Sequence, residues 1–341
     1  MIKIDDVYPT LDYLAKRYYF FLNKKKKDRN YRVGALINII RQARATDVLN
    51  NNNELVDFWD YFLNNNYANL KRVIIGRPSV LEQIILEIEF QFPALSFSRL
   101  TPQNQLASSA TGIKVLEVFD YTNLYRAKQY CHDTYAKLKI SSCPYCNEGV
   151  AKVDLFQGRV NLREMLNHQL DHFFSQVRYP YLSLSFFNLI PSCYHCNSVL
   201  KGTTNLHTNT HINPYDNSVD DNFEFFIEDI LPDNETDVKV DFRQKTMFPT
   251  SALNDFNIKW RYNHPTIKKE IYKSYSTLKF HSNKVIKSIS EQYGINIPLE
   301  NDFNQNIRRQ LFHAPLNANE ILFTQYAKLK RDIFHFLELN N

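Results

Sequence analysis

The chain has 341 residues, with 41 lysines and arginines against 36 aspartates and glutamates, which gives a formal net charge of +5. Hydrophobic residues make up 44% and charged residues 23%, a balance typical of a packed globular protein rather than a disordered one. Only seven glycines occur, and neither glycine-rich phosphate-binding motif is found, which argues against ATP binding through a P-loop.

The first helical stretches follow from apolar residues that recur at steps of three and four. We expect helices over 12–27, 33–49, 55–75 and 79–92, with breaks at 50–55 and 77–79. The small polar run TPQNQLASSATG, at 101–112, predicts a linker or mobile loop. Helical spacing resumes over 122–140 and leads directly to Cys143.

From Cys143 to about residue 215, short apolar runs, prolines and cysteines replace the helical spacing, so strands are expected there. Beyond it, VKVDF at 238–242 predicts a strand, and 264–294 and 318–339 predict long helices. We therefore expect a mainly α protein with a small α+β core. The expected parts are a helical region at 1–125, a core at 126–215 and a mostly helical region at 216–341.

The N-terminal stretch lacks the continuous apolar run of a signal peptide, and other apolar runs are too short to span a bilayer. We therefore expect a cytoplasmic protein without a membrane partner. Cysteines in that compartment seldom form disulfides. Cys131 stands apart from the other four and is expected to be a core residue.

The remaining cysteines form two Cys-x-x-Cys pairs, CPYC and CYHC. A gap of two residues lets both thiolates of a pair reach one tetrahedral ion, and two pairs complete a closed structural zinc shell. We predict Zn²⁺ bound by Cys143, Cys146, Cys193 and Cys196. The alternative is buried or redox cysteines. His195, inside the second pair, is expected to face solvent rather than bind the ion.

Polar residues suited to phosphodiester hydrolysis lie between and just after these pairs. His172 titrates near neutrality and suits a general base, and the Asp171 carboxylate suits a hard cation. If both end a strand, their side chains point to opposite faces, toward a water and an ion respectively. Asn197 offers an amide oxygen as a second ligand, and Asn188 is placed to brace the loop behind His172.

These residues carry a resemblance. The pattern CPYCN, LDHFF and NLIPSCYHCN, over about 143–202, resembles the HNH endonuclease family in its zinc-clipped ββα-metal form. By that resemblance His172 is the general base, Asp171 and Asn197 hold a catalytic cation, and Asn188 stabilises the loop. The last motif position is asparagine rather than histidine, which favours Mg²⁺ or Mn²⁺.

The resemblance implies a metal-dependent endonuclease acting on nucleic acid, DNA in preference. The large helical flanks resemble those of effectors in bacterial antiviral defence, which a partner protein or self-assembly activates. The main alternative is a zinc module that binds nucleic acid or protein without cutting. A zinc-protease helix is disfavoured because Gln169 stands where His168-x-x-x-His172 would need glutamate.

Three basic features are candidates for phosphate contacts. Lys201, near a predicted helix end, is expected to be a surface residue, with phosphate contact as the alternative. Arg178 has the same two interpretations, a surface residue or a phosphate contact. The KKKK run at 24–27 reads as a solvated helix end, with a nucleic-acid patch as the alternative.

Overall fold

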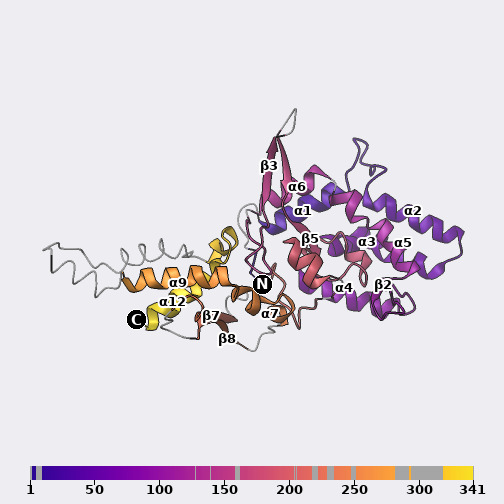
Figure 1. The fold of residues 1–341 in the computed structure, drawn as a ribbon. Helices are drawn as coiled ribbons and strands as arrows, with labels where there is room; N and C mark the ends of the chain where they lie inside the picture. Colours follow the sequence, from indigo (N-terminus) through magenta and orange to yellow (C-terminus); the bar gives the residue numbers. More distant parts are fainter. Residues whose placement is uncertain are drawn as a thin grey trace.

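The computed structural model describes a protein built mostly from helices. The described residues are 2–4, 10–126, 128–138, 140–157, 162–202, 204, 206–216, 222–228, 234–246, 251–280, 292 and 318–340. The helices of the N-terminal part gather on one side of the molecule, and α9 and α12 lie side by side on the other (Figure 1).

The four helices predicted first are present, as α1 (Leu11–Leu22), α2 (Leu36–Leu49), α3 (Asn53–Ile75) and α4 (Pro78–Gln91). α1 begins where the Thr10 side chain accepts a hydrogen bond from the Tyr13 amide, which satisfies a free amide of the first turn. α3 kinks at Asn64–Tyr67, where three residues have positive φ. Asparagine adopts that conformation more readily than most residues, so the Asn-rich run explains the kink.

The prediction of a linker at 101–112 is wrong. The stretch instead joins β1 (Ser98–Leu100) to β2 (Leu106–Ser108), with Arg99 opposite Ala107, and then starts α5 (Ala110–Val118). The Ser109 hydroxyl caps this helix by accepting from the Gly112 amide. A β-carbon on Gly112 would collide with the Phe97 carbonyl oxygen, so the glycine serves close packing rather than mobility.

The middle part contains the strands expected there. After the π-helix η1 (Thr122–Arg126) and α6 (Gln129–Ala136) come the hairpins β3–β4 (Val153–Gln157, Leu162–Leu166) and β5–β6 (Gln169–His172, Leu189–Ser192). Two 3-10 turns, η2 (Pro180–Leu182) and η3 (Phe186–Asn188), lie between β5 and β6. A π-helical segment, η4 (His195–Lys201), follows β6.

The C-terminal part pairs β7 (Phe223–Ile227) with β8 (Val240–Gln244), which confirms a strand near the predicted VKVDF. It continues through α7 (Ser251–Asp255), α8 (Ile258–Tyr262) and α9 (Pro265–Phe280) to η6 (Ala318–Phe323) and α12 (Ala327–Asn340). The helix predicted over 318–339 is therefore broken between these last two elements. Most of the predicted helix beyond Phe280 lies outside the described residues.

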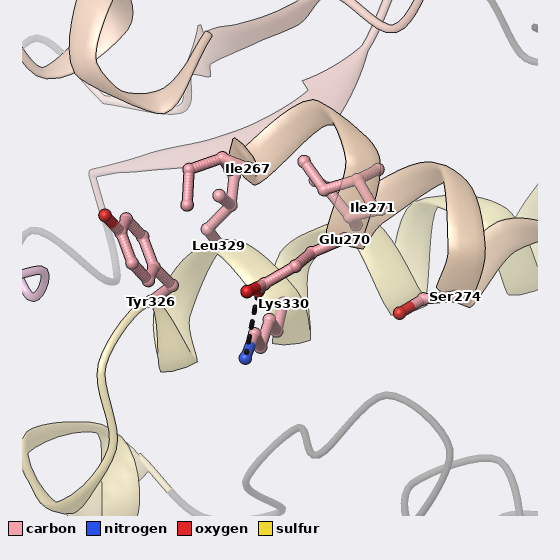
Figure 2. Close-up of a pocket in the computed structure, with 8 residues that line it drawn as sticks. Ile267, Glu270, Ile271, Ser274, Tyr326, Leu329 and Lys330 are labelled. Atoms are coloured by element: carbon pink, nitrogen blue, oxygen red, sulfur yellow. Dashed lines mark ion pairs between the residues drawn. The ribbon is translucent and has the colours of Figure 1, made fainter. Parts of the chain in front are cut away.

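A narrow apolar cavity of about 20 Å³ lies between α9 and α12, where Ile267 and Ile271 face Leu329 (Figure 2). Ile333 also lines this cavity. Glu270 and Lys330 close its rim, with Oε2 and Nζ 3.8 Å apart. The volume holds about one water molecule, so this contact is a helix–helix packing interface rather than a ligand site.

The middle part lies against both flanks. The amides of Ile2 and Ile4 donate to the carbonyls of Pro144 and Pro214, and Arg77 donates to the Tyr215 carbonyl. Buried apolar residues of all three parts join one cluster. Among the described helices, none combines the length and hydropathy needed to cross a bilayer.

Candidate metal centre and adjoining polar site

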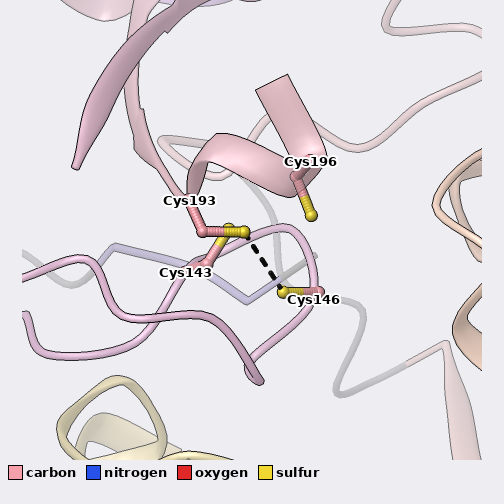
Figure 3. Close-up of side chains that lie close together, drawn as sticks. All are labelled: Cys143, Cys146, Cys193 and Cys196. Carbon is pink, nitrogen blue, oxygen red and sulfur yellow. Dashed lines mark hydrogen bonds between the residues drawn. The ribbon is translucent and has the colours of Figure 1, made fainter. Parts of the chain in front are cut away.

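Four cysteine thiols converge in the middle part. The sulfurs of Cys143, Cys146, Cys193 and Cys196 all lie within 4.8 Å of one another, and those of Cys146 and Cys193 are 3.9 Å apart (Figure 3). Tetrahedral zinc with Zn–S bonds of about 2.3 Å holds its sulfurs about 3.8 Å apart. The observed cluster fits that shell, and the four buried cysteines can hold a metal ion such as zinc.

The first cysteine pair lies on a tight turn that points backbone amides at sulfur. The amides of Glu148 and Gly149 approach Cys146 Sγ at 3.4 and 3.3 Å, and the Asn147 amide donates to the Cys143 carbonyl at 2.7 Å. Amide donors stabilise the negative charge of a thiolate ligand. A β-carbon on Gly149 would lie 2.5 Å from Cys193 Sγ, so only glycine fits between the two pairs.

The C-terminal part supplies further contacts to the cysteine cluster. Arg261, on α8, approaches Cys196 Sγ at 3.4 Å and donates from Nε to Glu148 Oε2 at 2.6 Å. The Tyr262 hydroxyl donates to the Cys146 carbonyl at 2.6 Å. A four-thiolate zinc site carries a net charge of −2, so a buried guanidinium beside it lowers the cost of enclosing that charge.

Asp171 lies in the middle of β5, opposite Ile190 of β6, and its carboxylate is enclosed. Oδ2 accepts a 2.6 Å hydrogen bond from the Tyr145 hydroxyl, and Oδ1 pairs with the Lys201 ammonium at 2.9 Å. Burial and the Asp171 carboxylate raise the pKa of Tyr145, which keeps this phenol protonated and able to donate. Tyr145 lies between the first two cysteines, so the metal centre and the carboxylate are directly linked.

His172 ends β5 and keeps 8% of its surface exposed. Its Nε2 lies 3.0 Å from the Ser183 carbonyl oxygen, and its ring meets Tyr121 edge-on at a centroid distance of 5.0 Å. Because a carbonyl oxygen only accepts, Nε2 carries the proton and Nδ1 is the acceptor of the neutral ring. Burial lowers the pKa of His172 to about 4, so the ring is neutral at pH 7.

The two predicted asparagines have different surroundings. Asn188 is fully buried; its Oδ1 accepts from the Phe174 amide at 2.7 Å, and its Nδ2 donates to the carbonyls of Phe174 and Leu182, each at 3.1 Å. It therefore joins the ends of the loop that follows His172. Asn197 is half-buried on η4, where its Nδ2 donates to Gln169 Oε1 at 2.7 Å.

The sequence analysis missed two partners of Asp171. The expectation of an exposed Lys201 is wrong, because its side chain is 3% exposed and donates both to Asp171 and to the His172 carbonyl at 2.9 Å. For Tyr145, between the first two cysteines, the sequence predicted no role. The sequence did offer one signal for Lys201. It follows Asn197 by four residues on the predicted helix, and that spacing places both side chains on one face.

The expected burial of Cys131 and exposure of His195 are confirmed. His168 is 5% exposed, with Nδ1 3.3 Å from the Lys152 carbonyl, and burial lowers its pKa to about 4. Arg178 is exposed beside a cavity of about 210 Å³ between α4 and the loop after β5.

No family model, curated protein or solved structure matches this chain. Among the described residues, these four cysteines form the one cluster of three or more Cys, His, Asp or Glu side chains close enough to share a metal ion.

Proposed function

We propose that the chain is a zinc-clipped endonuclease that hydrolyses phosphodiester bonds of nucleic acid, DNA in preference, with His172 as general base. The observation that carries the proposal is the bond from His172 Nε2 to the Ser183 carbonyl. A general base must be neutral and must present a nitrogen lone pair. This bond holds the ring in the tautomer whose Nδ1 can accept a proton from water. Burial lowers the pKa of the ring to about 4, and opening the site to solvent would raise that pKa toward neutrality, where a general base works best.

The order of elements around His172 supports the same proposal. Two antiparallel strands, β5 and β6, are followed by the short π-helical segment η4, and the proposed ββα-metal unit would need two strands and a helix in this order. The cysteine cluster joins the start of η4 to the first Cys-x-x-Cys turn, and Asn188 braces the intervening loop. His172 and Asp171 on β5 and Asn197 on η4 therefore belong to neighbouring elements, as the proposal requires.

The proposed catalytic cation would lie at Asp171 and Asn197. Asp171 and Asn197 offer hard oxygen ligands, which suit Mg²⁺ or Mn²⁺, and Mg²⁺ commonly keeps several waters beside one or two carboxylates. Bound there, the ion would supply charge stabilisation at the phosphate. The Lys201 ammonium holds Oδ1 of Asp171 in this structure, so cation binding requires Lys201 to move or to share the carboxylate.

That closed arrangement favours one alternative, a zinc module that binds nucleic acid or protein without cutting it. His172 is largely enclosed, and both oxygens of Asp171 have protein partners. For the nuclease, activation by a partner or by self-assembly would open the site, as expected of a defence effector. The two functions therefore differ in whether any condition exposes Nδ1 of His172 to substrate.

The test is a cleavage panel with the purified zinc-loaded chain. Plasmid, linear single-stranded DNA and RNA are incubated with Mg²⁺ or Mn²⁺, and His172→Ala is compared with wild type. His168→Ala is the matched control, because His168 is also a buried histidine with a lowered pKa. We expect His172→Ala to lose cleavage at least 100-fold with zinc content unchanged. Cleavage by His172→Ala at the rate of the wild type would contradict the role of His172.

A further inference from the structure

The chain between α1 and α2 leaves the helical body as a tight hairpin over residues 24–32 (Figure 1). Lys25 pairs with Tyr31 in an antiparallel bridge, and the Arg32 amide donates to the Lys24 carbonyl at 2.9 Å. The lysine run expected at a helix end therefore lies on a hairpin, because α1 ends at Leu22. We call residues 24–32 the basic hairpin.

The basic hairpin accounts for the net charge of the protein. It holds six of the 41 basic residues and one of the 36 acidic residues, so the rest of the chain has 35 of each and is neutral. Its one acid, Asp28, accepts hydrogen bonds from Asn30, and those bonds lower its pKa. Among the described residues, no carboxylate forms an ion pair with a cation of this hairpin. The positive charge is therefore directed at solvent.

A hollow of about 400 Å³ lies between the basic hairpin and the end of α1, and cations and aromatic rings line it together. The lining residues are Tyr19, Phe20, Asn23, Lys24, Lys25, Tyr31 and Arg32. Ligand sites for small molecules and cofactors commonly measure about 300–1,000 Å³, so one nucleotide unit fits. Phe20 is 68% exposed, which leaves a flat apolar face available at the rim.

The aromatic wall of the hollow is held in place before any ligand arrives. The Tyr31 ring meets the Tyr67 ring edge-on, with a centroid distance of 5.8 Å. Lys25 Nζ lies 4.9 Å from the centroid of the Tyr31 ring. Asn38 Nδ2 donates to the Tyr31 carbonyl at 3.0 Å and to the Arg32 carbonyl at 2.9 Å. A preordered site loses little conformational freedom on binding, which favours a specific ligand over loose charge attraction.

We propose that this hollow binds single-stranded nucleic acid, with phosphates at Lys24, Lys25 and Arg32 and a base stacked on Phe20. Sites for single strands combine a basic groove with exposed aromatic rings, because an unpaired base presents a free face. A duplex buries those faces, and an acidic peptide has none. The inference rests on the proposed function for its choice of nucleic acid, and it assigns the strand an anchoring site apart from the metal centre.

The experiment measures binding, so it does not depend on cleavage. Fluorescence anisotropy with a labelled 20-nucleotide strand, without Mg²⁺ or Mn²⁺, compares wild type with Lys24→Gln/Lys25→Gln. The matched control is Lys71→Gln/Lys269→Gln, which removes the same charge from exposed positions on α3 and α9. We expect at least tenfold weaker binding for the hairpin variant alone. Its slope of log affinity against log salt should flatten by about 1.4, for two lost phosphate contacts.

A second pair of variants tests stacking. Phe20→Ala should weaken binding to the single strand about tenfold and leave duplex binding unchanged, whereas Phe90→Ala, also exposed, should change neither. Equal losses for both lysine pairs, tighter binding of duplex or heparin than of the single strand, or no effect of Phe20→Ala would overturn the proposal. Hairpin-dependent binding by a chain that cleaves none of the substrates in the Mg²⁺ and Mn²⁺ panel would count against the nuclease proposal and leave this one standing.

Discussion

Replacing Lys201 by methionine tests how the polar site is held together. The substitution keeps most of the side-chain volume but removes the ammonium that bonds Asp171 Oδ1 and the His172 carbonyl, each at 2.9 Å. Both side chains of the pair are 3% exposed, so Asp171 would retain a buried charge with only Tyr145 as a partner. Removing one member of a buried ion pair costs about 3–5 kcal/mol, so we expect a loss of unfolding free energy in that range.

The assay is urea unfolding followed by far-UV circular dichroism and by the fluorescence of the buried Trp59, with coincident transitions required. Lys71→Met, at an exposed site, should change the unfolding free energy by less than about 0.5 kcal/mol. The double variant Asp171→Asn/Lys201→Met should lose less unfolding free energy than the two single variants added together, because it leaves no unpaired buried charge. A Lys201→Met protein as stable as wild type, or additive losses, would refute the buried pair.

Three further predictions follow from the same structure. Gly149→Ala should lower bound zinc per chain, measured by mass spectrometry, whereas Gly34→Ala should not, because nothing lies within 4 Å of its added β-carbon. The unfolding free energy should fall as pH drops from about 6.5 to 4. His168 and His172, with folded pKa values of about 4, remain largely neutral over this range, whereas the same histidines in the unfolded chain take up protons. Each histidine should therefore lower the unfolding free energy by roughly 3 kcal/mol at pH 4, and His172→Gln should halve the combined loss. Asn188→Ala should cost about 2–4 kcal/mol, measured by urea unfolding, because it leaves buried backbone groups of the loop unpaired.

The features that sequence predicted well depend on neighbours close in the chain. Periodic apolar residues located the first four helices within a few residues, except after Leu22. Two Cys-x-x-Cys pairs implied a shared ion because their geometry is constrained by a single turn each, and the structure brings the four sulfurs together. The candidate general base was identified from its residue type, but its tautomer and neutrality follow from Ser183 and from burial, which no local pattern reveals.

The sequence predictions were wrong where contacts with residues distant in the chain determine the local structure. Residues 101–112 have a loop-like composition, yet Phe97 packs on Gly112 and turns the stretch into a hairpin and a helix start. A lysine near a helix end is usually a surface residue, yet Lys201 is buried because it pairs with Asp171 on the neighbouring strand. A local pattern can predict which groups exist, but the partners of a buried charge are set by tertiary packing.

The turn that carries the first cysteine pair is also one of the points where the C-terminal part attaches. Asn147, in the left-handed conformation, donates from Nδ2 to the carbonyls of Ile321 and Thr324, and its own carbonyl accepts from the Tyr326 amide. Two residues earlier, Tyr145 bonds Asp171. A shift of the C-terminal part would therefore move the turn that holds both the metal ligands and the hydroxyl on the candidate catalytic carboxylate. The residues after the core thus have a direct physical route to the site, which a loosely tethered flank would lack.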